Sequence, residues 1–172
     1  MSMRGDFGTV YDEELGSIYG FFAYRVASVA DAEELTQRTF ERALRAWDRF
    51  DPERAPLRTW LLAIGRNLLI DHYRADVWAR RQAIEEVPEG ELGSELPEPD
   101  LGIEPELASA LAELVPRDRE VLALRFGGDL SGPEIATVTG LSLANVQQIL
   151  SRSLRRLRDR LEDGELSPRR AG

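Results

Sequence analysis

The chain has 172 residues and 42% hydrophobic content, which allows one domain or two small ones. It contains no cysteine and a single histidine, His72, which excludes disulfides, thiolate nucleophiles and cysteine- or histidine-rich metal sites. No apolar run approaches the roughly 20 residues needed to cross a membrane, and no signal peptide is visible, so a cytoplasmic protein without membrane insertion is expected. Neither a glycine-rich phosphate loop nor a paired-acid motif is present, which argues against an enzyme and against a bound cofactor or metal.

The net charge of −9 is concentrated in one segment. Residues 85–106 hold nine acidic residues and no base, whereas the rest of the chain carries 22 acids and 22 arginines. Prolines and glycines recur through this segment, so it is expected to be a flexible, extended linker. It would reach at most about 70 Å, or about two turns of DNA. Two near-neutral lobes are therefore expected on either side of it.

Two helices are expected at the start of the first lobe. An apolar stripe at helical spacing predicts a helix over residues 9–29. A capping-box pattern, Asp31 with Glu34, predicts that a second helix starts at Asp31 and runs to about Trp47. Its polar face suits either solvent or a protein partner.

A loop and a long helix complete the first lobe. Two prolines predict a loop over residues 48–56, which would either hold a flipped base or simply connect two helices. Residues 57–81 then form a helix with one apolar face and, on its other side, arginines interleaved with aromatic rings. Such a surface suits unpaired bases and phosphates, although an ordinary core helix with a solvated arginine face has the same pattern.

The second lobe carries the clearest local signals. Helices are expected over residues 106–114 and 116–126, the second ended by Gly127 and Gly128. Ser131 with Glu134 forms a capping box, Gly140 suits a tight turn, and Ser142 caps another helix. This order of cap, turn and cap is typical of a helix-turn-helix whose second helix reads DNA. The alternative is a helical hairpin used for protein contact.

The two lobes together resemble the extracytoplasmic-function (ECF) sigma factors of bacterial RNA polymerase. Residues 31–40, 57–67 and 71–74 are similar to the family's region two, and residues 114–126 and 131–136 to its region four. The resemblance implies an all-α protein of two small helical bundles joined by a flexible acidic linker, the second bundle containing the helix-turn-helix. The expected boundaries are 1–84 for region two, 85–105 for the linker, 106–163 for region four and 164–172 for a disordered tail.

The resemblance also implies three sets of site residues. The helix after Asp31 would dock on the coiled coil of the polymerase's largest subunit through Glu33, Glu34, Leu35 and Gln37. Recognition and melting of the minus-ten element would use Phe50, Arg58, Trp60, Asn67 and Arg74. The minus-thirty-five element would be read by Ser142, Ala144, Asn145, Gln148, Ser151, Arg152, Arg155 and Arg156.

Several partners follow from the same resemblance: the polymerase core, through its coiled coil and its flap, promoter DNA, and an anti-sigma factor. The acidic linker would run through the basic interior of polymerase. Gln147 and Gln148 stand near the start of the recognition helix, where family members commonly have a basic residue. The alternative function is a stand-alone helix-turn-helix regulator, which would bind duplex DNA without polymerase.

Overall fold

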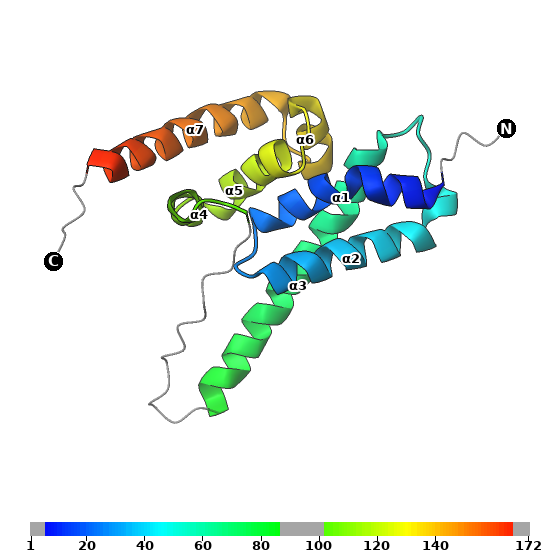
Figure 1. Cartoon of the computed structure of the whole chain (residues 1–172), viewed down its shortest axis with the longest axis horizontal. Helices are drawn as coiled ribbons and strands as arrows, with labels where there is room; N and C mark the ends of the chain where they lie inside the picture. Colours follow the sequence, from blue (N-terminus) through cyan, green and yellow to red (C-terminus); the bar gives the residue numbers. More distant parts are fainter. Residues whose placement is uncertain (1–5, 87–101, 167–172) are drawn as a thin grey trace.

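In the computed structural model of the chain, residues 6–86 and 102–166 are described, and all their regular structure is helical (Figure 1). The expected all-α class is therefore confirmed. Most of the acidic linker and of the C-terminal tail lies outside the described residues. Within the described ranges, no helix is both long and apolar enough to span a membrane.

The first bundle consists of α1 (Phe7–Ala23), α2 (Val29–Arg45), the short 3-10 turn η1 (Trp47–Arg49) and α3 (Leu57–Glu86). The three long helices cross at Gly65, where an added Cβ would lie 3.1 Å from Phe22 and 3.3 Å from Thr39. Beyond this crossing the C-terminal half of α3 projects away from the body of the molecule (Figure 1). The first bundle therefore buries only the N-terminal half of α3.

The cap of α2 differs from the expected one. The helix begins at Val29, and its N-cap is Ser28, whose hydroxyl oxygen accepts a hydrogen bond from the Asp31 backbone N–H at 3.0 Å. Asp31 thus occupies the third helical position, where a carboxylate also suits the positive end of the helix dipole. Because the chain turns before Ser28, α1 ends at Ala23 rather than at Val29.

The second bundle consists of α4 (Pro105–Ala112), α5 (Pro116–Leu122), the π-helical turn η2 (Ala123–Gly127), α6 (Gly132–Thr139) and α7 (Leu143–Leu166). The predicted capping box of Ser131 and Glu134 forms at the start of α6, and Gly140 adopts the left-handed conformation with φ 75°. Ser142 accepts the Asn145 backbone N–H at 3.2 Å at the start of α7. The helix-turn-helix is therefore built as its local signals predict.

Gly127 and Gly128 end the helical segment as predicted, since η2 ends at Gly127 and Gly128 is its C-cap. Gly128 has φ −87°, and the positive φ belongs to the next residue, Asp129. Both glycines also allow close approach: an added Cβ would lie 2.4 Å from the Gly20 carbonyl oxygen at Gly127, and 2.8 Å from Leu62 at Gly128. The first bundle therefore lies directly against this helix end.

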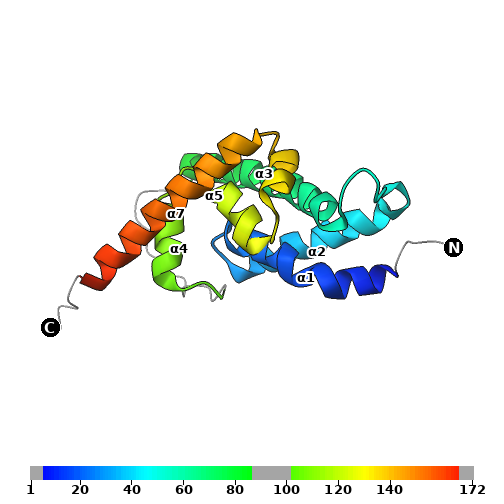
Figure 2. The same ribbon diagram turned by 90° about the horizontal axis from the view of Figure 1, so that it is seen from above.

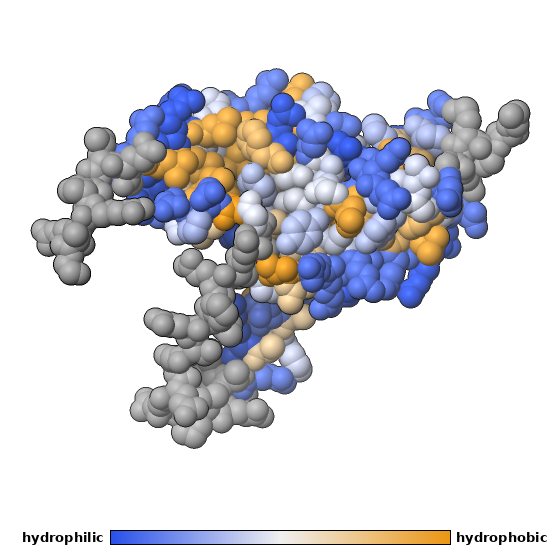
Figure 3. All heavy atoms as spheres, in the orientation of Figure 1, coloured by the Kyte–Doolittle hydropathy of each residue, from blue (hydrophilic) through white to orange (hydrophobic). Residues whose placement is uncertain are grey.

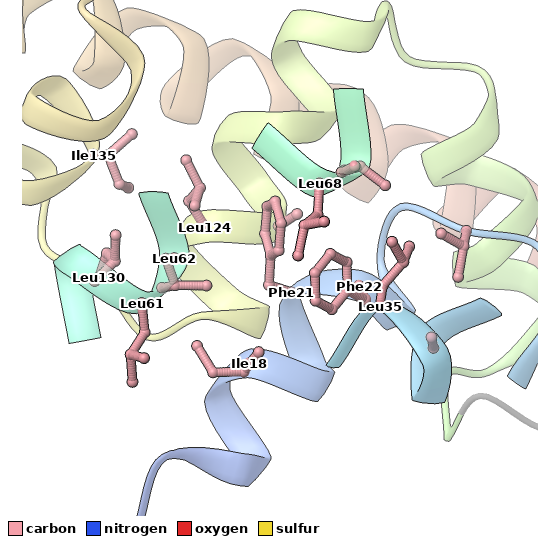
Figure 4. Packing of buried hydrophobic residues seen from close by; sticks show 14 of the residues in the cluster. Ile18, Phe21, Phe22, Leu35, Leu61, Leu62, Leu68, Leu124, Leu130 and Ile135 are labelled. Atoms are coloured by element: carbon pink, nitrogen blue, oxygen red, sulfur yellow. The ribbon is translucent and has the colours of Figure 1, made fainter. Parts of the chain in front are cut away.

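The two bundles share one hydrophobic core. Leu124, Leu130 and Ile135 of the second bundle belong to the same buried cluster as Phe21 and Leu62 of the first (Figure 4). A smaller core lies within the second bundle, between α4, α5 and α7. Seen from above, α7 runs diagonally across α5 (Figure 2). The two lobes thus form one closed body.

Candidate polymerase and nucleic-acid interfaces

The helix α3 presents two different faces. Trp60, Asn67 and Arg74 follow one another at seven-residue spacing and therefore share one side of the helix. Asn67 and Arg74 are exposed to solvent, and Trp60 is half-buried. An amide and a guanidinium in line with an aromatic ring can contact the edges and phosphates of an unpaired strand.

The other face of α3 carries arginines that are already paired. Arg58 donates from Nε to Glu14 at 2.6 Å and from Nη1 to Asp129 at 2.9 Å. Its bond to Glu14, aided by the charges of both carboxylates, raises the pKa of Arg58 above its ordinary value. The predicted minus-ten residue Arg58 is therefore held between α1 and the loop after η2.

An aromatic cluster supports the loop before α3. Phe50 stacks on Trp47 with ring centroids 5.5 Å apart, and the Phe50 and Trp60 rings are 5.0 Å apart. Phe50 is only 9% exposed, so much of its ring serves packing. The loop residues next to it, Asp51 to Arg54, are exposed. The packed rings therefore form a floor under a loop that is exposed to solvent.

The predicted polymerase-docking residues divide between surface and core. Glu33, Glu34 and Gln37 are exposed on the outer face of α2, where Arg38 pairs with Glu34 at 3.4 Å. Leu35 is 1% exposed and packs in the shared core, so it can support this face but offers no free surface. The N-terminal part of this face is acidic through Glu33 and Glu34, which suits a basic partner surface, whereas its last turn carries Arg42 and Arg45.

The predicted recognition residues lie on the outer side of α7. Ser142, Ala144, Gln148, Ser151, Arg155 and Arg156 are exposed and Asn145 is half-buried, while Val146 and Ile149 on the opposite side are buried. This division leaves short polar side chains at the start of the helix and arginines behind them. Such an arrangement fits base edges in the major groove and flanking phosphates.

Arg152 differs from the neighbouring exposed Arg155 and Arg156 because it forms an ion pair with another helix. Its Nη2 lies 2.7 Å from Oδ1 of Asp118, a carboxylate on α5 that is 1% exposed. The hydrogen bonds that Arg152 donates to Asp118 raise the pKa of Arg152, and Ser153 also donates to Asp118 at 3.4 Å. Arg152 therefore fastens the recognition helix to α5, which makes it a positioning residue in this arrangement.

Three charged groups were not among the predicted site residues. Arg66 on α3 donates from Nε to Glu120 on α5 at 2.7 Å, and Asp129 pairs with Arg58. Arg66 stands in the arginine-rich pattern of its helix, but nothing in the sequence indicates that Glu120 or Asp129 would face it. The positive φ of Asp129, 54°, becomes visible only in the structure.

Two sequence families match the chain: Sigma-70 region 2 over residues 10–85, and Sigma-70 region 4 over residues 110–159. The ECF RNA polymerase sigma factor RpoE of Cereibacter sphaeroides is 30% identical over 162 residues, which cover 90% of this chain and 86% of that protein. The chain belongs to the ECF sigma factors. Both helical bundles thus correspond to regions named in this family.

Other ECF sigma factors match to different extents. BldN of Streptomyces coelicolor is 32% identical over 161 residues, which cover 91% of this chain but only 61% of BldN. The RNA polymerase sigma factor CnrH of Cupriavidus metallidurans is 34% identical over 137 residues, covering 74% of this chain and 71% of that protein. The chain is therefore shorter than BldN and spans most of the length of the other two relatives.

Solved structures of sigma factors share the fold. CnrH in complex with the cytosolic domain of CnrY has a TM-score of 0.67 and 28% identity, covering 92% of this chain and 91% of that chain. RpoE in complex with the anti-sigma factor NepR from Bartonella quintana has a TM-score of 0.73 at 21% identity, covering 91% and 97%. Both matches extend over the two bundles.

Proposed function

We propose that this ECF sigma factor binds the core of bacterial RNA polymerase and directs it to promoters. The observation that carries this proposal is the presence of both regions in one chain, with exposed polar residues on the outer sides of α2, α3 and α7. The outer face of α2 would dock on the coiled coil of the largest subunit through Glu33, Glu34 and Gln37, with Leu35 supporting it from the core. The chain would act in the cytoplasm, where polymerase works.

Promoter melting would take place around α3. The loop after Phe50 would hold a base flipped from the minus-ten element, above the floor formed by Trp47 and Trp60. Asn67 and Arg74 would then contact the opened strand, and Arg58, on the other face of α3, would join them once it leaves Asp129. The chain itself would make and break no covalent bonds. Melting would draw on the free energy of binding unstacked bases, a few kcal/mol per base at most, which is enough to shift the melting equilibrium.

Duplex recognition would belong to α7. Its exposed N-terminal part, from Ser142 to Arg156, would enter the major groove of the minus-thirty-five element. Leucines gather where α7 passes α4, lining an open apolar groove that lies within the orange area of Figure 3. Its leucines are Leu107, Leu154, Leu157 and Leu161. We assign this groove to the polymerase flap.

An anti-sigma factor is a further partner that we propose. The support is the likeness to CnrH, whose structure was solved with the cytosolic domain of CnrY, at 28% identity and a TM-score of 0.67. Such a partner would hold the chain away from polymerase until a signal releases it.

The direct test is retention of purified core polymerase by the immobilised full chain. Stoichiometric retention, lost on competition with a known sigma subunit, is expected if the chain docks as a sigma factor. Tight duplex binding by the free chain, without any retention of core, would instead favour the stand-alone regulator. Paired matches to region two and region four in one chain do not favour that alternative.

A further inference from the structure

Two arginines meet between the bundles without a carboxylate. Arg25, in the turn after α1, donates from Nη1 to the Pro116 carbonyl at 2.7 Å, and Arg119 of α5 donates from Nε to the Tyr24 carbonyl at 2.9 Å. Within residues 6–86 and 102–166 neither guanidinium has an ion-pair partner. Both arginines therefore bind backbone oxygens of the opposite bundle while their charges stay without an acidic partner.

Burial makes this lack of a counter-charge costly. Arg25 is 8% exposed, and in the described part of the chain its Nε has no hydrogen-bond partner. The Tyr73 ring offsets part of its charge, because Cζ of Arg25 lies 5.6 Å from the ring centroid. Burial lowers the pKa of Arg119, and the nearby charge of Arg25 adds to this effect. Since buried charges in proteins are normally paired, Arg119 is a cation that still lacks a counter-charge.

Arg119 lies in the wall of an open cavity of about 610 Å³. This volume falls within the range of roughly 300–1,000 Å³ that is usual for small-molecule sites. The turn between α1 and α2 forms one side of the cavity and the start of α4 forms the other, and both ribbon views place these segments next to each other (Figures 1 and 2). Beside Arg119 and Tyr24 the wall is mostly small or aliphatic, with Ala23, Val26, Ala27, Ile103, Ala108 and Leu111.

The few polar groups of this wall select one kind of ligand. Within the described ranges no contact engages the two Nη groups of Arg119, which together can bind a carboxylate. Glu104, exposed at the start of α4, lines the same cavity and opposes a second negative charge on a ligand. The remaining wall offers aliphatic surface from both bundles. An acid with one negative charge and an aliphatic body matches these three properties.

A structural role alone explains the two arginines less well. Each of them ties the bundles together through a backbone carbonyl, and such a tie needs a hydrogen-bond donor but no charge. A neutral donor would supply the same bond without the cost of burying a cation. The charge of Arg119, next to an open cavity, is the property that the carbonyl tie leaves unexplained.

We propose that this cavity binds a small aliphatic monocarboxylate, with the carboxylate on Arg119 and the aliphatic chain against the wall between α1 and α4. The inference goes beyond the proposed sigma function and does not depend on it, because every contact belongs to the free chain. A ligand in this place touches both bundles. Its binding therefore stabilises their packed arrangement, so the cavity is an effector site for a small acid.

The test compares octanoate with 1-octanol, which has the same eight-carbon chain but no charge. Backbone amide shifts of the full-length chain report both the affinity and the place of binding. We expect wild type to bind octanoate with a Kd of about 1 mM or tighter, which is ordinary for about ten non-hydrogen atoms. Octanol should bind at least about tenfold more weakly, because it forms no charge-assisted hydrogen bond. The largest shifts should occur at Ala27 and Ala108, on the two sides of the cavity.

Two substitutions separate the cavity from the charge. Ala108→Leu fills the cavity from an exposed position on α4 and should abolish binding of both probes. Ala79→Leu is its matched control, since Ala79 is exposed on α3 outside the cavity wall, and it should bind both probes as wild type does. Arg119→Gln should lower the octanoate affinity to that of octanol and leave the octanol affinity unchanged. An arginine with only a structural role would lower both affinities together.

Three outcomes would overturn the proposal. Equal affinity of wild type for octanoate and octanol would show that the cavity offers apolar contact only. Shifts centred on the groove of Leu154 and Leu161 would place the ligand elsewhere, and undiminished binding to Ala108→Leu would do the same. If Arg119→Gln does not fold, the two probes and Ala108→Leu still decide. None of these measurements uses polymerase, so their failure leaves the sigma assignment standing.

Discussion

Single residues in this protein often perform a local task and a long-range one together. Glu134 accepts the Ser131 backbone N–H at 2.8 Å within the capping box of α6, and it also accepts a hydrogen bond from Thr59 of α3. The hydrogen bond from the Ser131 hydroxyl is the main cause that lowers the pKa of Glu134 below its ordinary value of 4.5. Its carboxylate therefore stabilises the folded state only while it is ionised.

This gives a pH prediction. Because the folded-state pKa is lowered, the stabilisation by Glu134 is fully present above the unfolded pKa of 4.5 and is lost as the pH falls through the lowered value. Glu134→Gln should therefore lose stability near pH 7 and show a shallower decline between about pH 5 and pH 3 than wild type. Urea midpoints across that range measure both effects. Parallel declines for the two proteins would contradict the account.

Removal of the Ser131 hydroxyl tests the partner of Glu134 in the same capping box. Ser131→Ala should lower the free energy of unfolding by about 1 kcal/mol, the usual cost of an N-cap replacement. Thr137→Ala is a matched control, since Thr137 is exposed on the same helix and its hydroxyl only donates to the Pro133 carbonyl. Urea unfolding at pH 7 compares them. Equal losses would mean that the cap contributes nothing specific.

Asn67 offers the cleanest single-residue test of strand contact. It is exposed on α3, whereas Trp60 packs against Trp47 and Phe50, so truncation of Trp60 would also disturb the loop. Asn67→Ala should reduce permanganate reactivity of the melted promoter several-fold while core binding and thermal unfolding stay as in wild type. Equal loss of core binding and melting would show that this helix is merely structural.

At the scale of helices, capping and turn residues predicted most of the helix boundaries that they mark. Ser131 with Glu134, Gly140 and Ser142 each mark a boundary through chemistry within four residues, and each boundary forms as predicted. Asp31 was misassigned because Ser28, three residues earlier, is an equally good cap and the sequence does not show where α1 ends.

The contacts between the bundles could not be predicted from local capping and turn patterns. Arg66 and Glu120 are 54 positions apart in the chain, and Arg58 and Asp129 are 71 apart. Helical periodicity identifies a buried face without naming the element that covers it. Leu35 illustrates the same limit: the resemblance assigned it to polymerase docking, and packing places it in the core.

The α2 surface gives a prediction of its own. Glu33→Arg combined with Glu34→Arg should weaken core binding by at least about tenfold, because like charges across an interface cost several kcal/mol. Asp12→Arg combined with Glu13→Arg is the control, since these acids are exposed on α1. Titration of labelled core measures the affinities. Equal loss for both pairs would mean that net charge matters and the α2 face does not.

For the whole molecule, the charge distribution and the packing of the two bundles both weaken attraction to DNA phosphates. Outside residues 85–106 acids and arginines are equal in number at 22 each, so long-range attraction to phosphates is weak. The packing then engages two arginines of α3 internally. Sequence composition predicted the balanced charge, whereas only the fold shows that arginines of α3 are paired internally.

The free chain should accordingly bind promoter duplex poorly. We expect affinity no better than non-specific binding, about 10⁻⁴ to 10⁻⁶ M at physiological salt, and a shallow salt dependence. Fluorescence anisotropy with promoter duplex, with and without core polymerase, measures the difference. Tight binding by the free chain that resists salt would argue against the sigma function.

The most direct test of the central claim is abortive transcription by core polymerase plus the purified chain on a promoter library. The sigma account predicts short transcripts from a subset of templates that share two elements, with none from core alone and far fewer with Asn67→Ala. The enriched sequences would define both elements. Absence of promoter-dependent transcripts, with core and templates shown to be active with another sigma subunit, would contradict it.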